Sequence, residues 1–319
     1  MCKVTVSTVT YNREHLLPRA IDSVLGQTFR DFEYLIINNG STDSTAEILE
    51  KYSHLDKRIK IISFDENKVD SSSVYERWNI FTENSDIPYI THVDDDDYIK
   101  PEMVETLYQL ITEYDADMAS VGSVLFYPDG TEKNKFVFDG KYVYSRIEAM
   151  KEFLKREKFN AAKGGKLFRK TLYHNLTLPK VNVARDIYSS YRIMNNVNKM
   201  VVTGEPMYYF YRHDKNMSGL DSPEQITPIR MCQHLEANAI RTKWLSEQMP
   251  EIKDFVLYCE LAFMISLFER IHRLKVADCF DVANEMKIML HKHRAFLSQL
   301  EYLTAREKEI LNSILQENG

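Results

Sequence analysis

Short strand-forming runs alternate with helical patterns over about the first 100 residues, and this alternation constrains the fold most strongly. The expected strands are Val4–Thr10, Tyr34–Ile37, Ile59–Phe64 and Tyr89–Val93. The helical patterns between them are Leu16–Leu25, Ala46–Leu49 and Ser71–Glu83. Strands that alternate with helices in this way predict an α/β fold whose mostly parallel central sheet is covered by helices on both faces.

The pattern changes twice further along the 319-residue chain. The stretch "MASVGSVLFYPDGTEKNKFVF", which begins at Met118, predicts a strand, a Pro-Asp-Gly turn and a return strand. Beyond about Ser222 the strand runs vanish, and an apolar face from Val256 to Ile271 marks helical structure. Because a single core rarely grows beyond about 300 residues, we expect a main domain over 1–220 and a helical region over 221–319 with three or four helices.

Composition excludes several classes of protein. Apolar residues make up 44% and charged residues 28%, as in globular proteins, and the net charge of −6 argues against a nucleic-acid partner. The four cysteines have no CxxC spacing, so neither a zinc site nor a disulfide framework is expected, which fits a cytoplasmic location. No signal peptide is visible, and the apolar stretch Phe255–Phe268 is too short to span a membrane.

Four adjacent aspartates, Asp94–Asp97, follow the fourth expected strand. Neighbouring carboxylates repel one another, and Asp is unfavourable in strands and helices, so local stability does not favour such a run. Ligands gather at the carboxyl ends of parallel strands, and Mg²⁺ or Mn²⁺ prefers carboxylate oxygens. If the run is extended, Asp94 and Asp96 point the same way and are the most useful pair. The alternative is a solvated acidic turn that caps a helix near Pro101.

Several motifs in the right order resemble family 2 glycosyltransferases of the GT-A fold, a Rossmann-like architecture. The resemblance covers roughly residues 3 to 215. "VTVSTVTYNREHLLPRAIDSVLGQTFRDFEYLIINNGSTDST" is similar to the opening of that family, and "HVDDDDYI" is similar to its DxD motif. "GGKLFRKTLY", "RDIYSSYRIM" and "PMYYFYRHDKNMSG" resemble three later motifs of the family.

The resemblance implies an inverting hexosyltransferase-type enzyme that moves a sugar from a nucleoside diphosphate donor to a hydroxyl of a glycan or other surface polymer. Carried over by position, Asp94 contacts the donor ribose, Asp96 holds Mn²⁺ or Mg²⁺, and Asp186 is the general base. A general base placed away from the metal fits this chemistry, although a helix-start aspartate is the simpler structural interpretation of Asp186. The further donor-site residues that the resemblance implies are Thr10, Tyr11, Asn12, Asn39, Arg77 and Asp95.

Arg212 and His213 fall where the family folds its closing segment back toward the donor. The resemblance therefore implies that Arg212 contacts phosphate and His213 the metal, and the alternative is a surface pair at the end of a strand. Gly164 and Gly165 are expected to permit a close backbone approach on the acceptor side.

Two departures from the family pattern leave questions open. Asn38-Asn39 replaces the usual Asp-Asp, so the base specificity is uncertain, with uridine ahead of thymidine, cytidine and guanosine. Arg185 replaces the usual acidic neighbour of the base, where it either lowers the pKa of Asp186 or contacts an anionic acceptor.

Two other functions compete with glycosyl transfer. A nucleotidyltransferase usually has a Gly-rich loop after its first strand, and "TYNREH" contains no glycine. A non-catalytic nucleotide- or sugar-binding module would explain the changes at Asn38-Asn39 and Arg185. Peripheral contact with the inner face of the membrane and self-association through the C-terminal helices both stay open.

Overall fold

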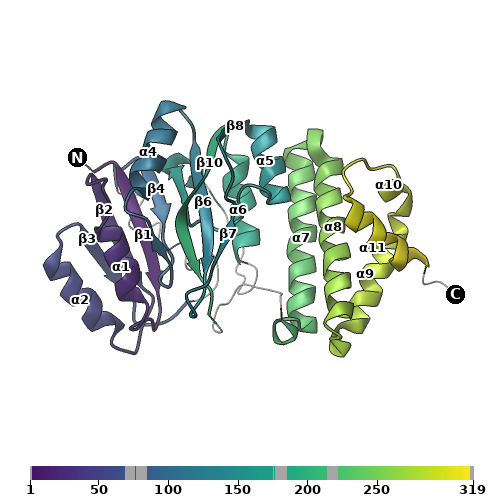
Figure 1. The fold of residues 1–319 in the computed structure, drawn as a ribbon, viewed down its shortest axis with the longest axis horizontal. Helices are drawn as coiled ribbons and strands as arrows, with labels where there is room; N and C mark the ends of the chain where they lie inside the picture. Colours follow the sequence, from purple (N-terminus) through teal and green to yellow (C-terminus); the bar gives the residue numbers. More distant parts are fainter. Residues whose placement is uncertain are drawn as a thin grey trace. The chain divides into compact units, whose positions relative to one another are not determined.

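The computed structural model describes residues 2–68, 76, 85–174, 176, 185–213 and 222–316 (Figure 1). Backbone contacts divide the chain into two compact units, Met1–Asp214 and Lys215–Gly319. The first unit contains a sheet with helices against it, and the described part of the second contains helices alone. This arrangement confirms the predicted α/β fold with C-terminal helices.

The first unit is built on a ten-stranded mixed sheet with the order β3-β2-β1-β4-β9-β6-β10-β5, to which β7 adds on β6 and β8 on β10. The strands of the parallel block at one end of the sheet are β1 (Val4–Thr10), β2 (Phe32–Asn38), β3 (Ile59–Ser63) and β4 (Tyr89–His92), and a second parallel pair joins β6 to β10. The others are β5 (Tyr98–Ile99), β6 (Met118–Phe126), β7 (Glu132–Lys135), β8 (Lys141–Ser145), β9 (Lys166–Arg169) and β10 (Lys199–Tyr211). Thr10 pairs with Asn38, so the carboxyl ends of β1 and β2 meet at one edge of the sheet.

The helices of this unit bury one apolar face each. They are α1 (Leu17–Leu25), α2 (Thr45–Leu55), α4 (Met103–Glu113), α5 (Arg146–Lys155) and α6 (Arg185–Asn195). In α1 the buried residues are Leu17, Ala20, Ile21 and Val24, which recur at the spacing that the sequence predicted. Asp43, just before the N-cap residue Ser44, supports the start of α2, because the backbone N–H of Thr45 donates to its Oδ1 at 3.0 Å. Most of the helix predicted over Ser71–Glu83 lies outside the described residues.

Strand β10 holds the short strands β8 and β5 on the sheet. It runs parallel to β6 along one side, and on its other side it pairs first with β8 and then with β5. The register against β6 shifts between Val202 and Tyr208. As a result, Tyr209 pairs with Tyr98, directly after the aspartate run, and the end of β10 is held beside that run.

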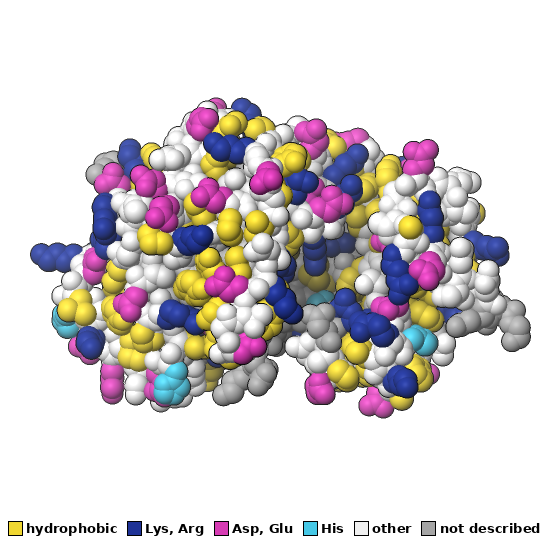
Figure 2. Space-filling view, viewed as in Figure 1, with side chains coloured by type: hydrophobic (Ala, Val, Ile, Leu, Met, Phe, Trp, Pro, Cys, Tyr) yellow, Lys and Arg dark blue, Asp and Glu magenta, His cyan; other side chains and the backbone are white. Residues whose placement is uncertain are grey.

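The described part of the second unit contains α7 (Pro228–Gln248), α8 (Lys253–Arg273), α9 (Phe280–Lys292), α10 (Arg294–Ser298) and α11 (Ala305–Gln316). These are more than the three or four helices that the sequence predicted, because His293 leaves helical geometry and separates α10 from α9. Helix α8 packs against α7, α9 and α11. None of the helices in the described ranges is both long and apolar enough to cross a bilayer. On the face seen in Figure 2, acidic and basic side chains are interspersed over each unit.

Candidate active site

The aspartate run forms a turn at the carboxyl end of β4. The backbone N–H of Asp97 donates to the carbonyl of Asp94 at 3.2 Å, which closes a turn over residues 94–97. The expectation of an extended segment with Asp94 and Asp96 on one side is therefore wrong. Each carboxylate instead faces a different environment, and the side chain of Asp94 is exposed.

Asp97 is a structural link between this turn and β10. Its side chain is buried, Oδ2 accepts the Tyr208 hydroxyl at 2.7 Å, and Oδ1 accepts the backbone N–H of Tyr211 at 2.8 Å. The Tyr208 hydroxyl in turn accepts the backbone N–H of Asp94 at 3.1 Å. Burial, together with the charges of Asp94 and Asp96, raises the pKa of Asp97 well above its usual range. Sequence reasoning missed this role because nothing in the run itself distinguishes the fourth aspartate from the others.

Asp96 faces His213, which follows β10. The carboxylate Oδ2 and the imidazole Nε2 lie 3.1 Å apart, and the side chains are 15% and 13% exposed. A carboxylate oxygen and an imidazole nitrogen are both ligands for Mn²⁺, and such ions commonly complete their coordination with waters and substrate phosphates. The two side chains therefore fit a shared divalent cation. Across the described residues, no group of three or more His, Cys, Asp or Glu side chains is gathered as a metal site.

Asp95 points toward the loop after β1. The Nε of Arg13 lies 3.4 Å from its Oδ1. Burial, with a smaller contribution from the charge of Asp96, raises the pKa of Asp95 to about 6, and the charge of Arg13 opposes this shift. Arg13 thus ties the loop after β1 to the aspartate turn, a link that the sequence did not predict.

Hydrogen bonds also join the loops after β1 and β2. Asn12 has a φ of 51°, a left-handed conformation that asparagine tolerates better than most residues. Its Oδ1 accepts the backbone N–H of Thr42 at 2.8 Å, and its own N–H donates to Ser41 Oγ at 3.1 Å. Tyr11, at the same bend, is 38% exposed. The hydrogen-bonded loops around Asn12 and Thr42 thus form a rim at the ends of β1 and β2, from which the ring of Tyr11 is accessible.

Asn39 lies buried behind this rim. Its backbone N–H donates to the carbonyl of Thr10 at 2.9 Å. Its side-chain Nδ2 donates to Asn67 Oδ1 and to the carbonyl of Lys68, each at 2.8 Å. The two N–H groups of the amide are therefore both bonded within the chain.

The remaining predicted site residues are only partly described. Arg77 lies outside the described residues, and Arg185 and Asp186 begin α6 with side chains that also lie outside them. The backbone N–H of Arg212 donates to the carbonyl of Phe126 at 2.7 Å, which fixes the chain just before His213. The structure thus brings Asp96 and His213 together, and it places Thr10, Tyr11, Asn12 and Asn39 at one edge of the sheet.

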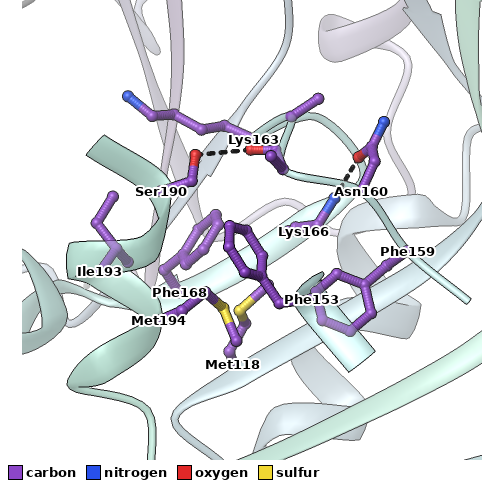
Figure 3. Close-up of a pocket in the computed structure, with 12 residues that line it drawn as sticks. Met118, Phe153, Phe159, Asn160, Lys163, Lys166, Phe168, Ser190, Ile193 and Met194 are labelled. Carbon is purple, nitrogen blue, oxygen red and sulfur yellow. Dashed lines mark hydrogen bonds between the residues drawn. The ribbon is translucent and has the colours of Figure 1, made fainter. Parts of the chain in front are cut away.

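A small pocket lies beside α6 (Figure 3). Its floor is apolar, with Phe153 and Phe168 among the lining side chains. The buried Lys166 donates to Asn160 Oδ1 at 3.2 Å, and Ser190 Oγ donates to the carbonyl of Ala161 at 2.8 Å. The loop that precedes β9 is therefore held against α6, one turn beyond Asp186.

Gly164 in this loop makes the close approach expected of it, and its neighbour is Tyr208. A Cβ atom at Gly164 would lie 2.3 Å from Tyr208 Cζ, far inside contact distance. Gly164 also bridges to His92 at the end of β4. The absence of a side chain thus lets this loop pass over the tyrosine that supports Asp97.

Comparison with known proteins identifies the family to which the chain belongs. The family model described as "Glycosyl transferase family 2" matches residues 5–177. The chain is 28% identical to "Glycosyltransferase GlyA" of Streptococcus pneumoniae over 217 residues, which is 65% of this chain and 30% of that protein. The chain therefore spans less than a third of the length of this relative.

Solved structures share the fold at low sequence identity. S. aureus TarS 1-349 in complex with UDP-GlcNAc has a TM-score of 0.63 at 18% identity, over 98% of this chain and 87% of that chain. The mannosyltransferase PcManGT from Pyrobaculum calidifontis in complex with GDP-Man and Mn²⁺ has a TM-score of 0.51 at 10% identity, over 98% and 79%.

Proposed function

The chain belongs to glycosyl transferase family 2, and from this premise we propose that it is an inverting, metal-dependent enzyme. It moves a sugar from a nucleoside diphosphate sugar to a hydroxyl of a glycan or other surface-polymer acceptor, as in polysaccharide biosynthesis. The observation that carries this proposal is the 3.1 Å approach of Asp96 and His213 at the edge of the sheet where the parallel strands end. Ligands of such sheets bind at this edge.

Asp96 and His213 would hold Mn²⁺ or Mg²⁺. When bound, the ion supplies Lewis acidity to the leaving diphosphate. The solved neighbour PcManGT carries Mn²⁺, which supports this choice of cofactor. Arg212, beside His213, and Arg77 would contact the phosphates, and Asp94, exposed at the start of the turn, would contact the ribose. Asp95, fixed by Arg13, would line the same part of the donor site.

The loops after β1 and β2 would hold the base, with Tyr11 stacked on it and Asn12 and the backbone of Thr10 forming the rim. Both N–H groups of the Asn39 amide are bonded within the chain, so the amide would recognise the base through its carbonyl oxygen. A carbonyl oxygen accepts the N3–H of uracil but cannot pair with cytosine N3, which is itself an acceptor. This supports a uridine donor, as does the UDP-GlcNAc bound to TarS.

Asp186 would be the general base that takes the proton of the acceptor hydroxyl. A chain of contacts leads from the start of α6 to the aspartate turn and supports this role. Ser190, one turn after Asp186, donates to the loop that carries Gly164. That loop packs on Tyr208, whose hydroxyl accepts the backbone N–H of Asp94. Arg185, the adjacent cation, would keep Asp186 ionised or contact an anionic acceptor.

Different parts of the chain would bind the donor and the acceptor. Residues 1–100, joined by Arg212 and His213, would bind the nucleotide sugar, and the rest of residues 101–220 would bind the acceptor. The helices of residues 221–319 would shape the acceptor side, associate with a second copy or contact a membrane surface. A truncation that ends near Leu220, stays folded, keeps its oligomeric state and transfers at full rate would remove the helices from this scheme.

The test is an assay of the purified protein with UDP-sugars, with and without Mn²⁺. Release of UDP that depends on Mn²⁺ is the expected result. Release of pyrophosphate from a nucleoside triphosphate would indicate a nucleotidyltransferase instead. Nucleotide binding without turnover, across a panel of sugars and acceptors, would indicate a binding module.

A further inference from the structure

We propose that Arg19 is a positioning residue that holds the Asp96–His213 pair in the geometry needed to bind the divalent cation. The inference rests on the proposed function, since it takes these two side chains as the metal ligands. Arg19 lies on α1, distant in sequence from both of them, and it is not among the site residues that the sequence predicted.

Arg19 contacts both of the segments that carry the pair. Its Nη2 donates to the backbone carbonyl of Asp96 at 2.5 Å. Its guanidinium carbon lies 4.3 Å from the centroid of the Tyr211 ring, and that ring lies 5.3 Å from the ring of His213. One side chain therefore links the backbone of one proposed ligand to the aromatic support of the other.

Two further rings, from other strands, surround the guanidinium. The Arg19 guanidinium carbon lies 5.4 Å from the ring centroid of Tyr98 and 5.8 Å from that of Phe126. These two rings pack edge to face with centroids 5.6 Å apart, and Phe126 also lies 5.6 Å from Tyr211. The cation thus sits among aromatic side chains from β5, β6 and β10, where its attraction to the ring faces favours one position.

The shape of the arginine side chain matters for this arrangement. A planar guanidinium can present its face to Tyr211 while one of its N–H groups points at the carbonyl of Asp96. Lysine carries a compact charge and cannot provide both contacts with fixed geometry. Mutating a residue that orients a metal ligand typically lowers metal affinity by about 10–100-fold.

The simpler alternative is that Arg19 only packs, and Arg58 provides a matched control for it. The guanidinium of Arg58 lies 4.4 Å from the Phe32 ring centroid and donates through Nη2 to the carbonyl of Leu25 at 3.2 Å. Each arginine also has one buried guanidinium nitrogen without a hydrogen bond among the described residues. Phe32 begins β2, however, so Arg58 lies at the end of the sheet opposite to the proposed site.

The experiment compares Arg19→Met, Arg19→Lys and Arg58→Met with the wild type. Mn²⁺ is titrated into each protein in the presence of UDP, and free Mn²⁺ is followed by electron paramagnetic resonance. We expect Arg19→Met to weaken Mn²⁺ binding by about 10–100-fold, Arg19→Lys to lie between it and the wild type, and Arg58→Met to bind normally. Thermal melts without metal test whether each variant is folded. If Arg19→Met does not fold, the Mn²⁺ affinity of Arg19→Lys is the result that tests the proposal.

The failures are distinguishable. Wild-type affinity in the folded Arg19 variants, or an equal loss in Arg58→Met, would overturn the positioning role and leave the proposed function intact. A wild type that binds no Mn²⁺ in the presence of any nucleoside diphosphate would overturn the metal site, and the role of Arg19 with it.

Discussion

Asp96 and His213 lie 117 positions apart in the chain, and their side chains meet at 3.1 Å. The meeting depends on Asp97, which accepts hydrogen bonds from Tyr208 and Tyr211 of β10 and so anchors that strand beside the turn. The proposed metal site is therefore assembled by the fold and not by any local sequence motif alone.

Replacing Asp96 by Asn should abolish Mn²⁺-dependent nucleotide binding. The amide keeps the size of the side chain but removes the charged ligand, and we expect affinity to fall by at least about a hundredfold, since even supporting residues affect it by about 10–100-fold. Isothermal titration with UDP and Mn²⁺ measures the change. Asp281→Asn, at an exposed position of α9, is the control and should bind normally. Unchanged binding by Asp96→Asn would exclude this carboxylate as a ligand.

Replacing Asp186 by Asn should separate binding from catalysis. Loss of a general base is expected to lower kcat by at least about a hundredfold, while the affinity for UDP stays unchanged. Single-turnover transfer and equilibrium binding are measured on the same preparation. If the variant transfers at the wild-type rate, Asp186 is not the base.

The nucleotide preference should follow the Asn39 amide. Because its N–H groups are already bonded to Asn67 and Lys68, we expect UDP to raise the melting temperature in Mn²⁺ more than CDP does. An unpaired polar group in the complex corresponds to an affinity difference of about tenfold or more. A panel of UDP, dTDP, CDP and GDP checks this, and equal shifts for UDP and CDP would contradict recognition through Asn39.

Stability should depend on pH through His92. Burial, with the nearby charge of Lys163, lowers the pKa of this imidazole well below its usual value, and its Nε2 is 3.0 Å from the Tyr173 hydroxyl. The unfolded chain therefore binds a proton at this imidazole that the folded one does not, and the contribution of His92 to the free energy of unfolding falls as the pH drops below about 6.5, by up to about 1.4 kcal/mol per pH unit. The raised pKa values of Asp95 and Asp97 act in the opposite direction, so comparison with a His92 variant isolates this contribution.

Urea denaturation between pH 7.5 and 5, in the presence of a chelator, measures this dependence. As the pH falls, the free energy of unfolding of the wild type should drop relative to that of His92→Gln, because glutamine does not titrate. His54→Gln, at a side chain that is 78% exposed, should behave like the wild type. Parallel curves for the wild type and His92→Gln would refute the assignment.

A methyl group at Gly164 should disturb the site through Tyr208. The added Cβ would lie 2.3 Å from Tyr208 Cζ, so the ring must move and its bond to Asp97 must loosen. We expect Gly164→Ala to lower the free energy of unfolding by about 1–3 kcal/mol and to weaken nucleotide binding. In the control Gly26→Ala the nearest atom is the carbonyl oxygen of Asp22 at 3.2 Å, and a smaller effect is expected.

The strands and helices of the parallel half could be predicted from the sequence because their periodicity is local. Val4–Thr10 was predicted with its observed bounds, and Leu17–Leu25 within one residue. Helix α10 could not be predicted, since the break at His293 involves neither proline nor glycine and depends on the backbone of that single residue.

The site could be predicted only in part. The residue types at positions 94–97 indicated an acidic site, but which carboxylate faces which partner depends on the turn closed by Asp97 and on the position of β10. Arg19 was missed because it stands in an ordinary amphipathic helix, where an arginine resembles any solvated residue. Its contacts come from strands that only tertiary structure brings to it.

The position of β10 in the sheet means that insertions and deletions are tolerated at some places in the chain and not at others. Because side chains alternate along a strand, deleting one residue between Tyr208 and Tyr211 would turn the strand side chains after the deletion to the opposite face and shift His213, which follows the strand. The exposed bend that joins β6 to β7, around Asp129 and Gly130, carries no such constraint. Loop grafting or tag insertion should therefore succeed at that bend and silence the enzyme when made in the last residues of β10.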